Sequence, residues 1–348
     1  LVLAHHFKKP DPEALKGLYL DQVNAVLHTL DPYSSRLEAE TESKTPIIQK
    51  QAPHFGIDLM FKQGSVKVIP RKDGALYRAG FRDQQELVTL GGASVSGMTM
   101  NDVGLALKQA SYAGTVSLGI RKHAAAKVQL VHLRPADTPR LPVEVLEIDK
   151  QPFIRVYEFV PHETRRLLAE AIGSLCRSGS ALILDLRYAS GGDLFEGLDS
   201  ASLFLSGGQR LATLVDNKGR QESYHALHNQ QLVSGKVLIL TGPFTASASE
   251  VFAQALQHYG VAVLAGGKTH GKCLSQRQFT LPDGSRLRLS NRMILDPKGR
   301  YCDGQGISPD VSVPENDMAN TPLLIRLAWP YLVLENEQQP LEKNCIGE

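Results

Sequence analysis

The first half of the chain changes its hydrophobic pattern twice. Residues 11–30 carry apolar side chains at helical spacing after an Asp-Pro pair, which is typical of a capped helix start. Residues 38–50 are polar, and we interpret them as a linker. From about residue 52 to 138, short runs separated by turns predict several strands and one helix over residues 100–109.

Longer strands and helices are predicted in the second half. Residues 181–187 form an apolar run without alternation, which predicts a strand covered on both faces. The stretch 163–177 keeps its apolar residues on one side and predicts a helix. A strand over residues 237–240 leads into another helix. The apolar helix predicted after residue 317 is expected to break at Pro330.

The composition narrows the class of protein. A chain of 348 residues is long for a single core and favours two or three units. Its 42% hydrophobic and 21% charged residues are typical of a globular protein. The net charge of +2, from 38 basic and 36 acidic residues, gives no reason to expect a nucleic-acid partner. No apolar run approaches the length of about 20 residues that a transmembrane helix needs, so no membrane span is expected.

The cysteines and the first residues give weaker signals. The four cysteines match no zinc-like spacing, so the sequence predicts no metal site; they are Cys176, Cys273, Cys302 and Cys345. The sequence leaves open whether Cys273 and Cys302 form a bridge or are reduced and packed. The chain starts without Met or a basic leader, which suggests that a targeting segment has been removed.

The stretch from residue 236 to 276 holds the strongest functional signal. An apolar strand ends at a Gly-Pro pair, and a small-residue turn then opens a helix, so Ser247 lies at the junction. A hydroxyl at such a junction is exposed beside backbone N–H groups that have no partner within the helix. A serine nucleophile with its own oxyanion site needs this arrangement. An ordinary N-cap serine occupies the same kind of position.

A serine hydroxyl is a weak nucleophile and needs a base within hydrogen-bond reach. Lys272 and His270 lie in a glycine-rich loop after the next predicted strand. A lysine acts as a base only when burial lowers its pKa, and the small uncharged neighbours in this loop favour that. In an extended loop both side chains point to the same side, so both bases stay open at this point.

The same residues resemble the carboxyl-terminal processing, or tail-specific, proteases. Ser247-Ala-Ser-Glu250 is followed by Thr269-His-Gly-Lys272, and Gln276 stands four residues further on. In that family a serine and a lysine twenty-five residues later form the catalytic dyad, which implies Ser247 and Lys272 here. The resemblance also implies that Gln276 orients the lysine. It gives Glu250 and Thr269 a supporting role.

A second segment of that family's site follows the apolar run. The sequence YASGG resembles the segment whose glycines donate a backbone N–H to the oxyanion in the family. The resemblance implies that Gly191 or Gly192, together with the N–H of Ala248, stabilises the developing negative charge. Tyr188 and Ala189 replace the family's pair of asparagines, which leaves the geometry of this loop open. Without the resemblance, the two glycines predict only a turn.

The β-rich stretch resembles a PDZ domain. Five residues stand where such domains hold the terminal carboxylate of a peptide: Phe55, Gly56, Ile57, Asp58 and Leu59. Successive backbone N–H groups bind a carboxylate, and the edge of the following strand pairs with an extended peptide. The alternative is that Gly56 only permits a turn before a strand.

The resemblance covers about residues 11–314 and implies a fold class. This is an α/β catalytic domain of the ClpP/crotonase type, with an inserted PDZ-like β-rich domain and an N-terminal helical segment. The implied boundaries are 1–50 for the helical segment, 51–138 for the PDZ-like domain, 139–316 for the catalytic domain and 317–348 for a C-terminal helical tail.

The implied activity is that of a serine endopeptidase that recognises and cleaves proteins at or near their C-terminal tails, with no cofactor. Its partners would be protein or peptide substrates with free C-termini, and a homo-oligomer or an adaptor protein is left open. The implied compartment is extracytoplasmic, in a bacterial periplasm or cell envelope. Two alternatives stay open: a Ser/His hydrolase that uses His270, and a non-catalytic peptide-binding protein with an inactive protease domain.

Overall fold

The structure is a computed structural model, and the chain divides into two compact units. The first comprises 1–46, 214–222 and 274–294, and the second comprises 47–213, 223–273 and 295–348. The described residues are 22–29, 31–37, 55–62, 65–71, 74–81, 85–98, 100–123, 125–135, 141–148, 150–177, 182–314, 317–318 and 320–333. The predicted helix start near residue 11, the predicted linker 38–50 and the end of the predicted tail lie outside them. The predicted four-part division stays a prediction.

The first unit is organised around β16 (Arg286–Leu295). This strand pairs antiparallel with β1 (Ser35–Leu37) and with β15 (Leu274–Thr280), and the latter pairing has an irregularity after Ser275. The sheet has the order β1-β16-β11-β12, in which β11 is Arg210–Asp216 and β12 is Gln221–His225. Residues 22–28 are helical, which confirms that part of the helix predicted over residues 11–30.

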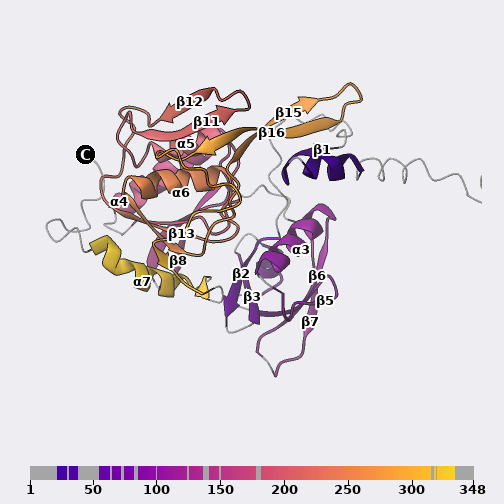
Figure 1. Ribbon diagram of the computed structural model, residues 1–348. Coiled ribbons are helices and arrows are strands. Elements are labelled where there is room, and N and C mark those ends of the chain that lie inside the picture. Colours follow the sequence, from indigo (N-terminus) through magenta and orange to yellow (C-terminus); the bar gives the residue numbers. More distant parts are fainter. Residues whose placement is uncertain are drawn as a thin grey trace, which may run out of the picture. The chain divides into compact units, whose positions relative to one another are not determined.

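Residues 55–135, in the second unit, form a β-rich module around its own apolar core. Its sheet has the order β2-β3-β4-β6-β7, with β5 paired to β4, so β2 is an edge strand (Figure 1). The strands are β2 (Ile57–Lys62), β3 (Ser65–Pro70), β4 (Gln85–Leu90), β5 (Ala93–Ser94), β6 (Val116–Arg121) and β7 (Gln129–Leu133). The predicted helix is α3 (Met100–Tyr112), and a second helix, α2 (Ala75–Arg78), was not predicted because four residues show no helical period.

The rest of the second unit is an α/β structure. Its sheet has the order β17-β14-β13-β10-β9-β8, and every neighbouring pair is parallel except β9 with β8. The strands are β8 (Val143–Ile148), β9 (Gln151–Val156), β10 (Ile183–Asp185), β13 (Val237–Thr241), β14 (Ala262–Gly266) and β17 (Val311–Ser312). The helices are α4 (Thr164–Arg177), α5 (Leu194–Ala201), α6 (Ala248–His258) and α7 (Thr321–Val333).

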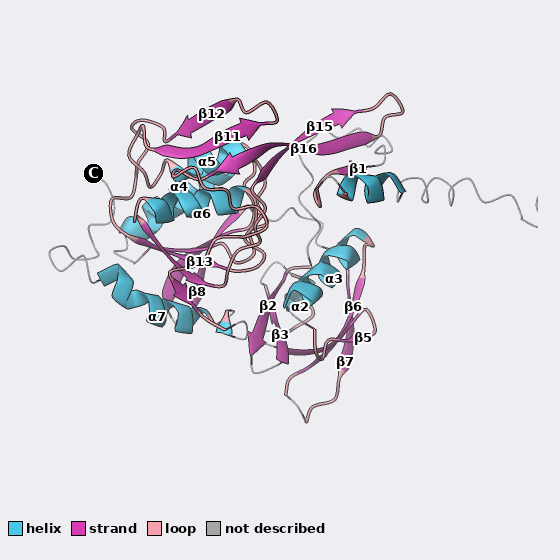
Figure 2. Cartoon of the chain, in the orientation of Figure 1, coloured by secondary structure: helices cyan, strands magenta, loops and turns pink. Residues whose placement is uncertain are grey.

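Helices cover both faces of this parallel sheet. Helices α4, α5 and α6 lie on one face and α7 lies on the other (Figure 2). On the α7 side, Ile183, Leu238 and Leu240 pack with Leu324 and Ala328. All three residues of β10 are buried, which confirms the strand predicted from the uninterrupted apolar run.

The predicted break at Pro330 is wrong, because α7 continues through it to Val333. A proline inside a helix removes one backbone hydrogen bond and crowds the preceding turn. Here it stands in the last turn, and the fully buried Leu324 and Ala328 together with Leu332 hold the helix on the sheet. A membrane-crossing helix would need more length and apolar character than any helix in the described part of the chain has.

A buried ion cluster ties the middle of the sheet to the start of α7. Asp185 is fully buried and accepts hydrogen bonds from the guanidinium groups of Arg155 and Arg187 at 2.8–3.0 Å. Arg187 also donates to Thr321 Oγ1 at 2.6 Å. Burial alone would raise the pKa of Asp185, but the charges of Arg187 and Arg155 outweigh it and lower this pKa. The carboxylate therefore stabilises the fold at every pH above about 4, and the contribution is lost only in stronger acid.

We expect Asp185→Asn to lower the free energy of unfolding by about 3–5 kcal/mol, because two buried guanidinium groups lose their counter-charge. Urea denaturation at pH 7 measures the change. The control is Glu170→Gln, which removes an exposed i,i+4 pair with Arg166 and should cost less than about 0.5 kcal/mol. Equal losses in the two variants would contradict a stabilising role for the buried cluster.

Candidate active site

Ser247 lies between the end of β13 and the start of α6, as the sequence predicts. Its φ of 56° and ψ of −122° fall in a region that is essentially restricted to glycine and costs about 1–3 kcal/mol for other residues. The preceding turn is fixed by Thr245, whose Oγ1 donates to Leu186 O at 2.8 Å and accepts from Gly242 N at 3.0 Å. The strained residue is therefore held by its surroundings, as is common at functional sites.

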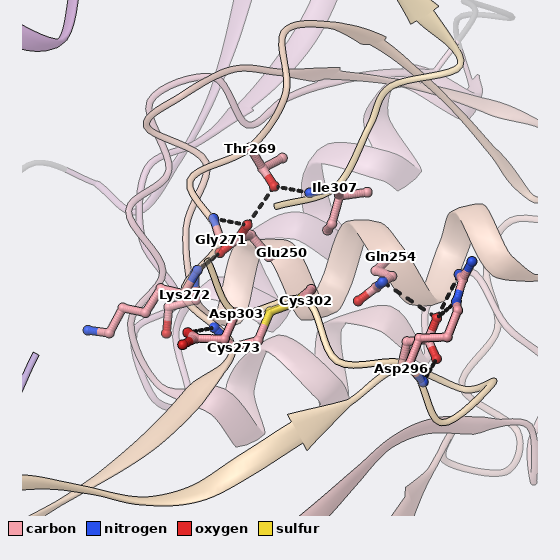
Figure 3. The surroundings of a disulfide bond; sticks show 12 residues. Glu250, Gln254, Thr269, Gly271, Lys272, Cys273, Asp296, Cys302, Asp303 and Ile307 are labelled. Atoms are coloured by element: carbon pink, nitrogen blue, oxygen red, sulfur yellow. Dashed lines mark hydrogen bonds and ion pairs between the residues drawn. A yellow bond between two sulfur atoms is a disulfide. The ribbon is translucent and has the colours of Figure 1, made fainter. Parts of the chain in front are cut away.

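The third residue of α6, Glu250, is fully buried, and its carboxylate contacts this junction and the segment of Thr269 and Gly271 (Figure 3). Its Oε2 accepts the backbone N–H of Ser247 at 2.9 Å and that of Lys272 at 2.8 Å. Its Oε1 accepts the backbone N–H of Gly271 at 2.7 Å and the hydroxyl of Thr269 at 2.5 Å. These four donors form the set that an ionised carboxylate accepts. The main chains of the predicted nucleophile and of the predicted base therefore meet at one oxygen atom.

The two candidate bases differ in their surroundings. His270 is exposed, and its backbone N–H donates to Thr245 O at 2.9 Å. Lys272 is half-buried, and its side chain extends away from the Glu250 carboxylate (Figure 3). Of the two side chains, that of Lys272 is the less exposed. The contact between its amine and the Ser247 hydroxyl stays a prediction.

Gln276, the residue predicted to orient Lys272, belongs to the first unit. It lies in β15 next to the irregularity in the pairing with β16. Its side-chain Nε2 donates to Tyr33 O at 2.8 Å, within the same unit. Its role toward Lys272 joins two units and stays a prediction.

The two glycines predicted for the oxyanion site have different neighbours. A Cβ atom built on Gly191 would lie 2.7 Å from Ser247 Cβ and 3.2 Å from Ala248 N, so Gly191 is in close contact with the nucleophile turn. A Cβ atom on Gly192 would instead collide with the main chain of Phe159, with which Gly192 forms a β-bridge. Ala248 is the first residue of α6, and within the described residues its N–H has no backbone acceptor. The geometry favours Gly191 and Ala248 as the pair of donors.

The segment that carries Lys272 is fastened to a second loop, residues 302–307. Cys273 forms a disulfide with Cys302, with a Cα–Cα distance of 5.5 Å, which settles the alternative that the sequence left open. The Cys273 N–H donates to Asp303 Oδ1 at 3.0 Å (Figure 3). On the other side of Lys272, Thr269 Oγ1 accepts the N–H of Ile307 at 2.7 Å. Lys272 therefore lies between two points at which its segment is held to the loop 302–307.

Sequence reasoning gave neither Asp303 nor Ile307 a role in the site. Gly304 and Gly306 between them have φ values of 67° and 66°, and a Cβ atom on Gly271 would lie 2.7 Å from Gly306 N. A Cβ atom on Gly306 would lie 2.3 Å from Thr269 O, so this glycine permits close approach of the two backbones, whereas Gly304 has no atom near its Cβ position. The glycine spacing in CDGQGI was thus the available signal for this part of the site.

The residues predicted to bind a peptide carboxylate lie at the start of β2. Gly56 has a φ of 63° and its main chain approaches Gly74 so closely that no Cβ atom fits, so the turn requires glycine. Phe55 and Leu59 are buried and Ile57 is half-buried, whereas the side chain of Asp58 lies outside the described part of the structure. The turn alternative thus describes the local backbone correctly, and peptide binding stays a prediction.

No metal site is apparent in the described residues. Among them, no three His, Cys, Asp or Glu side chains are arranged to hold an ion.

The fold and the site together have the features of a serine hydrolase: a parallel sheet covered by helices, and a strained serine at a strand-to-helix junction beside backbone donors. Residues 152–313 match the model of Peptidase family S41. The match spans the strands β9 to β17 and every residue of the site except those of the β-rich module.

Individual relatives agree with the family match. A protein of Staphylococcus aureus (strain N315) named "Probable CtpA-like serine protease" is 29% identical over 319 residues, covering 88% of this chain and 62% of that protein. A protein of the same name in Staphylococcus epidermidis (strain ATCC 12228 / FDA PCI 1200) is 29% identical over 318 residues, with the same coverage. The chain therefore spans less than two thirds of the length of these curated relatives.

A solved structure extends the similarity to most of the chain. The photosystem II D1 C-terminal processing protease is 25% identical, with a TM-score of 0.57, and the match covers 90% of this chain and 87% of that one. The comparisons confirm the resemblance to carboxyl-terminal processing serine proteases that the sequence motifs indicate. They also confirm a mixed α/β fold of this type.

We expect Glu250→Gln to lower the free energy of unfolding by about 3 kcal/mol. An amide places a donor group against backbone N–H groups, so one or two hydrogen bonds to a charged acceptor are lost. Urea denaturation measures the loss. The control is Ser249→Ala on the same helix, which removes a buried hydroxyl that has no hydrogen-bond partner in the described structure. That variant should be neutral or slightly stabilised, and equal stability of the two variants would contradict the role of the carboxylate.

Proposed function

We propose that this chain is a serine endopeptidase in which Ser247 is the nucleophile and Lys272 is the general base. The observation that carries the proposal is the Glu250 carboxylate, which binds the backbone N–H groups of both residues through one oxygen. A single buried anchor thus positions two residues that are far apart in the sequence. The family match and the names of the curated relatives support the same activity.

In the proposed mechanism, the uncharged amine of Lys272 takes the proton of the Ser247 hydroxyl as the oxygen attacks a peptide carbonyl. The N–H groups of Gly191 and Ala248 donate to the oxyanion, and each contributes about 3 kcal/mol to transition-state stabilisation. Lys272 then returns the proton to the leaving amine, and water releases the acyl group. Gln276 orients the lysine, and the steps require no cofactor.

We further propose that the β-rich module is a PDZ-like, tail-binding domain inserted into a catalytic domain of the ClpP/crotonase type. The edge position of β2 supports this, because an extended peptide adds to a free strand edge. The positive φ of Gly56 turns the chain immediately before β2, where backbone N–H groups suit a terminal carboxylate. Substrates would then be proteins cleaved at or near a free C-terminal tail, as the name of the D1 C-terminal processing protease says of that enzyme.

An extracytoplasmic location is also proposed. The bridge between Cys273 and Cys302 supports it, because disulfides persist mainly in oxidising compartments. Mass spectrometry of protein isolated from its source without reductant would detect the bridge. Both cysteines recovered as free thiols would contradict this location.

The function is tested with an unfolded substrate protein that carries either a free or an amidated C-terminus. We expect the free tail to be cleaved at least about tenfold faster, because the amide lacks the charge that the proposed carboxylate site binds. Ser247→Ala should abolish cleavage of both substrates. Equal rates for the two termini would reject tail recognition, and activity that survives in Ser247→Ala would reject the nucleophile.

The identity of the base is tested separately. Lys272→Ala should lower kcat by about 10² to 10⁴, the usual contribution of a general base. His270→Ala should keep activity within a few-fold, and so should Lys268→Ala, an exposed lysine of the same loop that serves as the control. Full activity in Lys272→Ala together with loss in His270→Ala would instead establish the Ser/His alternative.

A further inference from the structure

Among the described strands, β2 has a partner on one edge alone, and the register shows which backbone groups its other edge presents. Arg71 N donates to Gly56 O at 3.1 Å, next to the antiparallel pairing of β2 with β3. Hydrogen-bonded pairs alternate along such a ladder, so Asp58 and Met60 direct their backbone groups to β3. Leu59 therefore directs its N–H and C=O to the free edge. An added peptide strand would use these groups.

The Leu59 carbonyl already has a partner. The phenolic hydroxyl of Tyr188 donates to Leu59 O at 2.8 Å. This hydrogen bond takes the place of the one that a backbone N–H of an added peptide strand would make. Tyr188 is the residue at which the loop departs from the family's asparagine pair, so the resemblance gives no account of it.

Phe244, like Tyr188, belongs to the α/β part and contacts the β-rich module. Phe244 packs against the apolar core that contains Phe55, Leu59 and Val103. Its ring lies over α3 at Gly104, where an added Cβ atom would be 2.5 Å from the ring Cζ. A glycine at this position leaves room for an aromatic side chain, and any larger residue would displace it.

Both side chains come from segments that form the site. Phe244 stands three residues before Ser247, and Tyr188 stands three residues before Gly191. The two segments are joined by a hydrogen bond from Ala246 N to Ala189 O at 3.1 Å. Each of the two side chains therefore lies three residues along the chain from the proposed nucleophile or from a proposed oxyanion donor.

We propose that Phe244 and Tyr188 act as an internal ligand of the tail-binding surface, and that substrate tails ending in a large apolar residue replace them. The replacing residue would fill the space of the Phe244 ring, and a backbone N–H of the tail would donate to Leu59 O. The proposal rests on the tail recognition proposed above and names the class of tail that fits. Binding of a tail then releases the two segments that bear Ser247 and Gly191.

The test measures binding of a fluorescent ten-residue peptide that ends in Phe with a free carboxylate, and of its amidated form. The full chain is used in a Ser247→Ala background so that the peptide stays intact. Phe244→Ala should lower the Kd of the free-acid peptide at least about tenfold, because the competing side chain is gone. Tyr188→Phe should lower it about threefold, the effect of one hydrogen bond. The control is Phe195→Ala, an exposed aromatic residue of α5, which should leave the Kd unchanged.

A second readout is independent of these variants. Hydrogen exchange on the Ser247→Ala chain should become faster over residues 242–247 when the peptide binds, because Phe244 leaves its place, and slower over β2. A Kd that is equal in the parent and in Phe244→Ala, with exchange over residues 242–247 unchanged, would overturn the internal ligand.

The outcomes separate this proposal from the function on which it rests. In one outcome the acid peptide binds more tightly than the amide, but its Kd is the same with and without the Phe244 side chain. This outcome rejects the internal ligand and keeps tail recognition. Equal binding of acid and amide in every variant rejects tail recognition itself. If Phe244→Ala does not fold, as judged by its melting transition, Phe244→Leu and Tyr188→Phe take its place with the same direction of change.

Discussion

The organisation of the site depends on one buried negative charge. Glu250 is carried by α6, and its two oxygens accept donors from the turn before that helix and from the loop after β14. A carboxylate without partners would be strongly unfavourable at full burial, so the segments that supply its donors are fixed together with it. The strained backbone of Ser247 can persist because this arrangement determines its position from several sides. The chemistry proposed for the site therefore begins with hydrogen bonds made by main-chain atoms.

Most elements of the α/β part could be predicted from the sequence because their signals are local. The uninterrupted apolar run at residues 181–187 and the strand-to-helix junction at Ser247 appear in the structure where the pattern indicates. The family resemblance also selected Glu250 and Thr269, which contact each other directly. The choice between Gly191 and Gly192 could not be made from sequence, since both have positive φ and differ only in what each one approaches.

The remaining features depend on contacts between distant segments. The loop that contains Asp303 and Ile307 contacts the segment of Lys272 from more than 30 residues away, after two intervening strands. No periodicity reports such a contact, and cysteine counting alone left the bridge to Cys302 undecided. Likewise, α7 passes through Pro330 because packing on the sheet outweighs a local preference. The sequence around Tyr188 and Phe244 gives no sign that these side chains contact Leu59 and Gly104 of the β-rich module, and only the structure shows these contacts.

The hydrogen bond from Ile307 to Thr269 has a consequence for the order in which the protein is made. Thr269 Oγ1 connects the Glu250 carboxylate to a residue near the end of the α/β part. During vectorial synthesis or export, Ser247 and Lys272 emerge well before Ile307 does. A growing polypeptide therefore contains Ser247 and Lys272 before the hydrogen bond from Ile307 to Thr269 can form, and the full arrangement around Glu250 arises only once residue 307 is present.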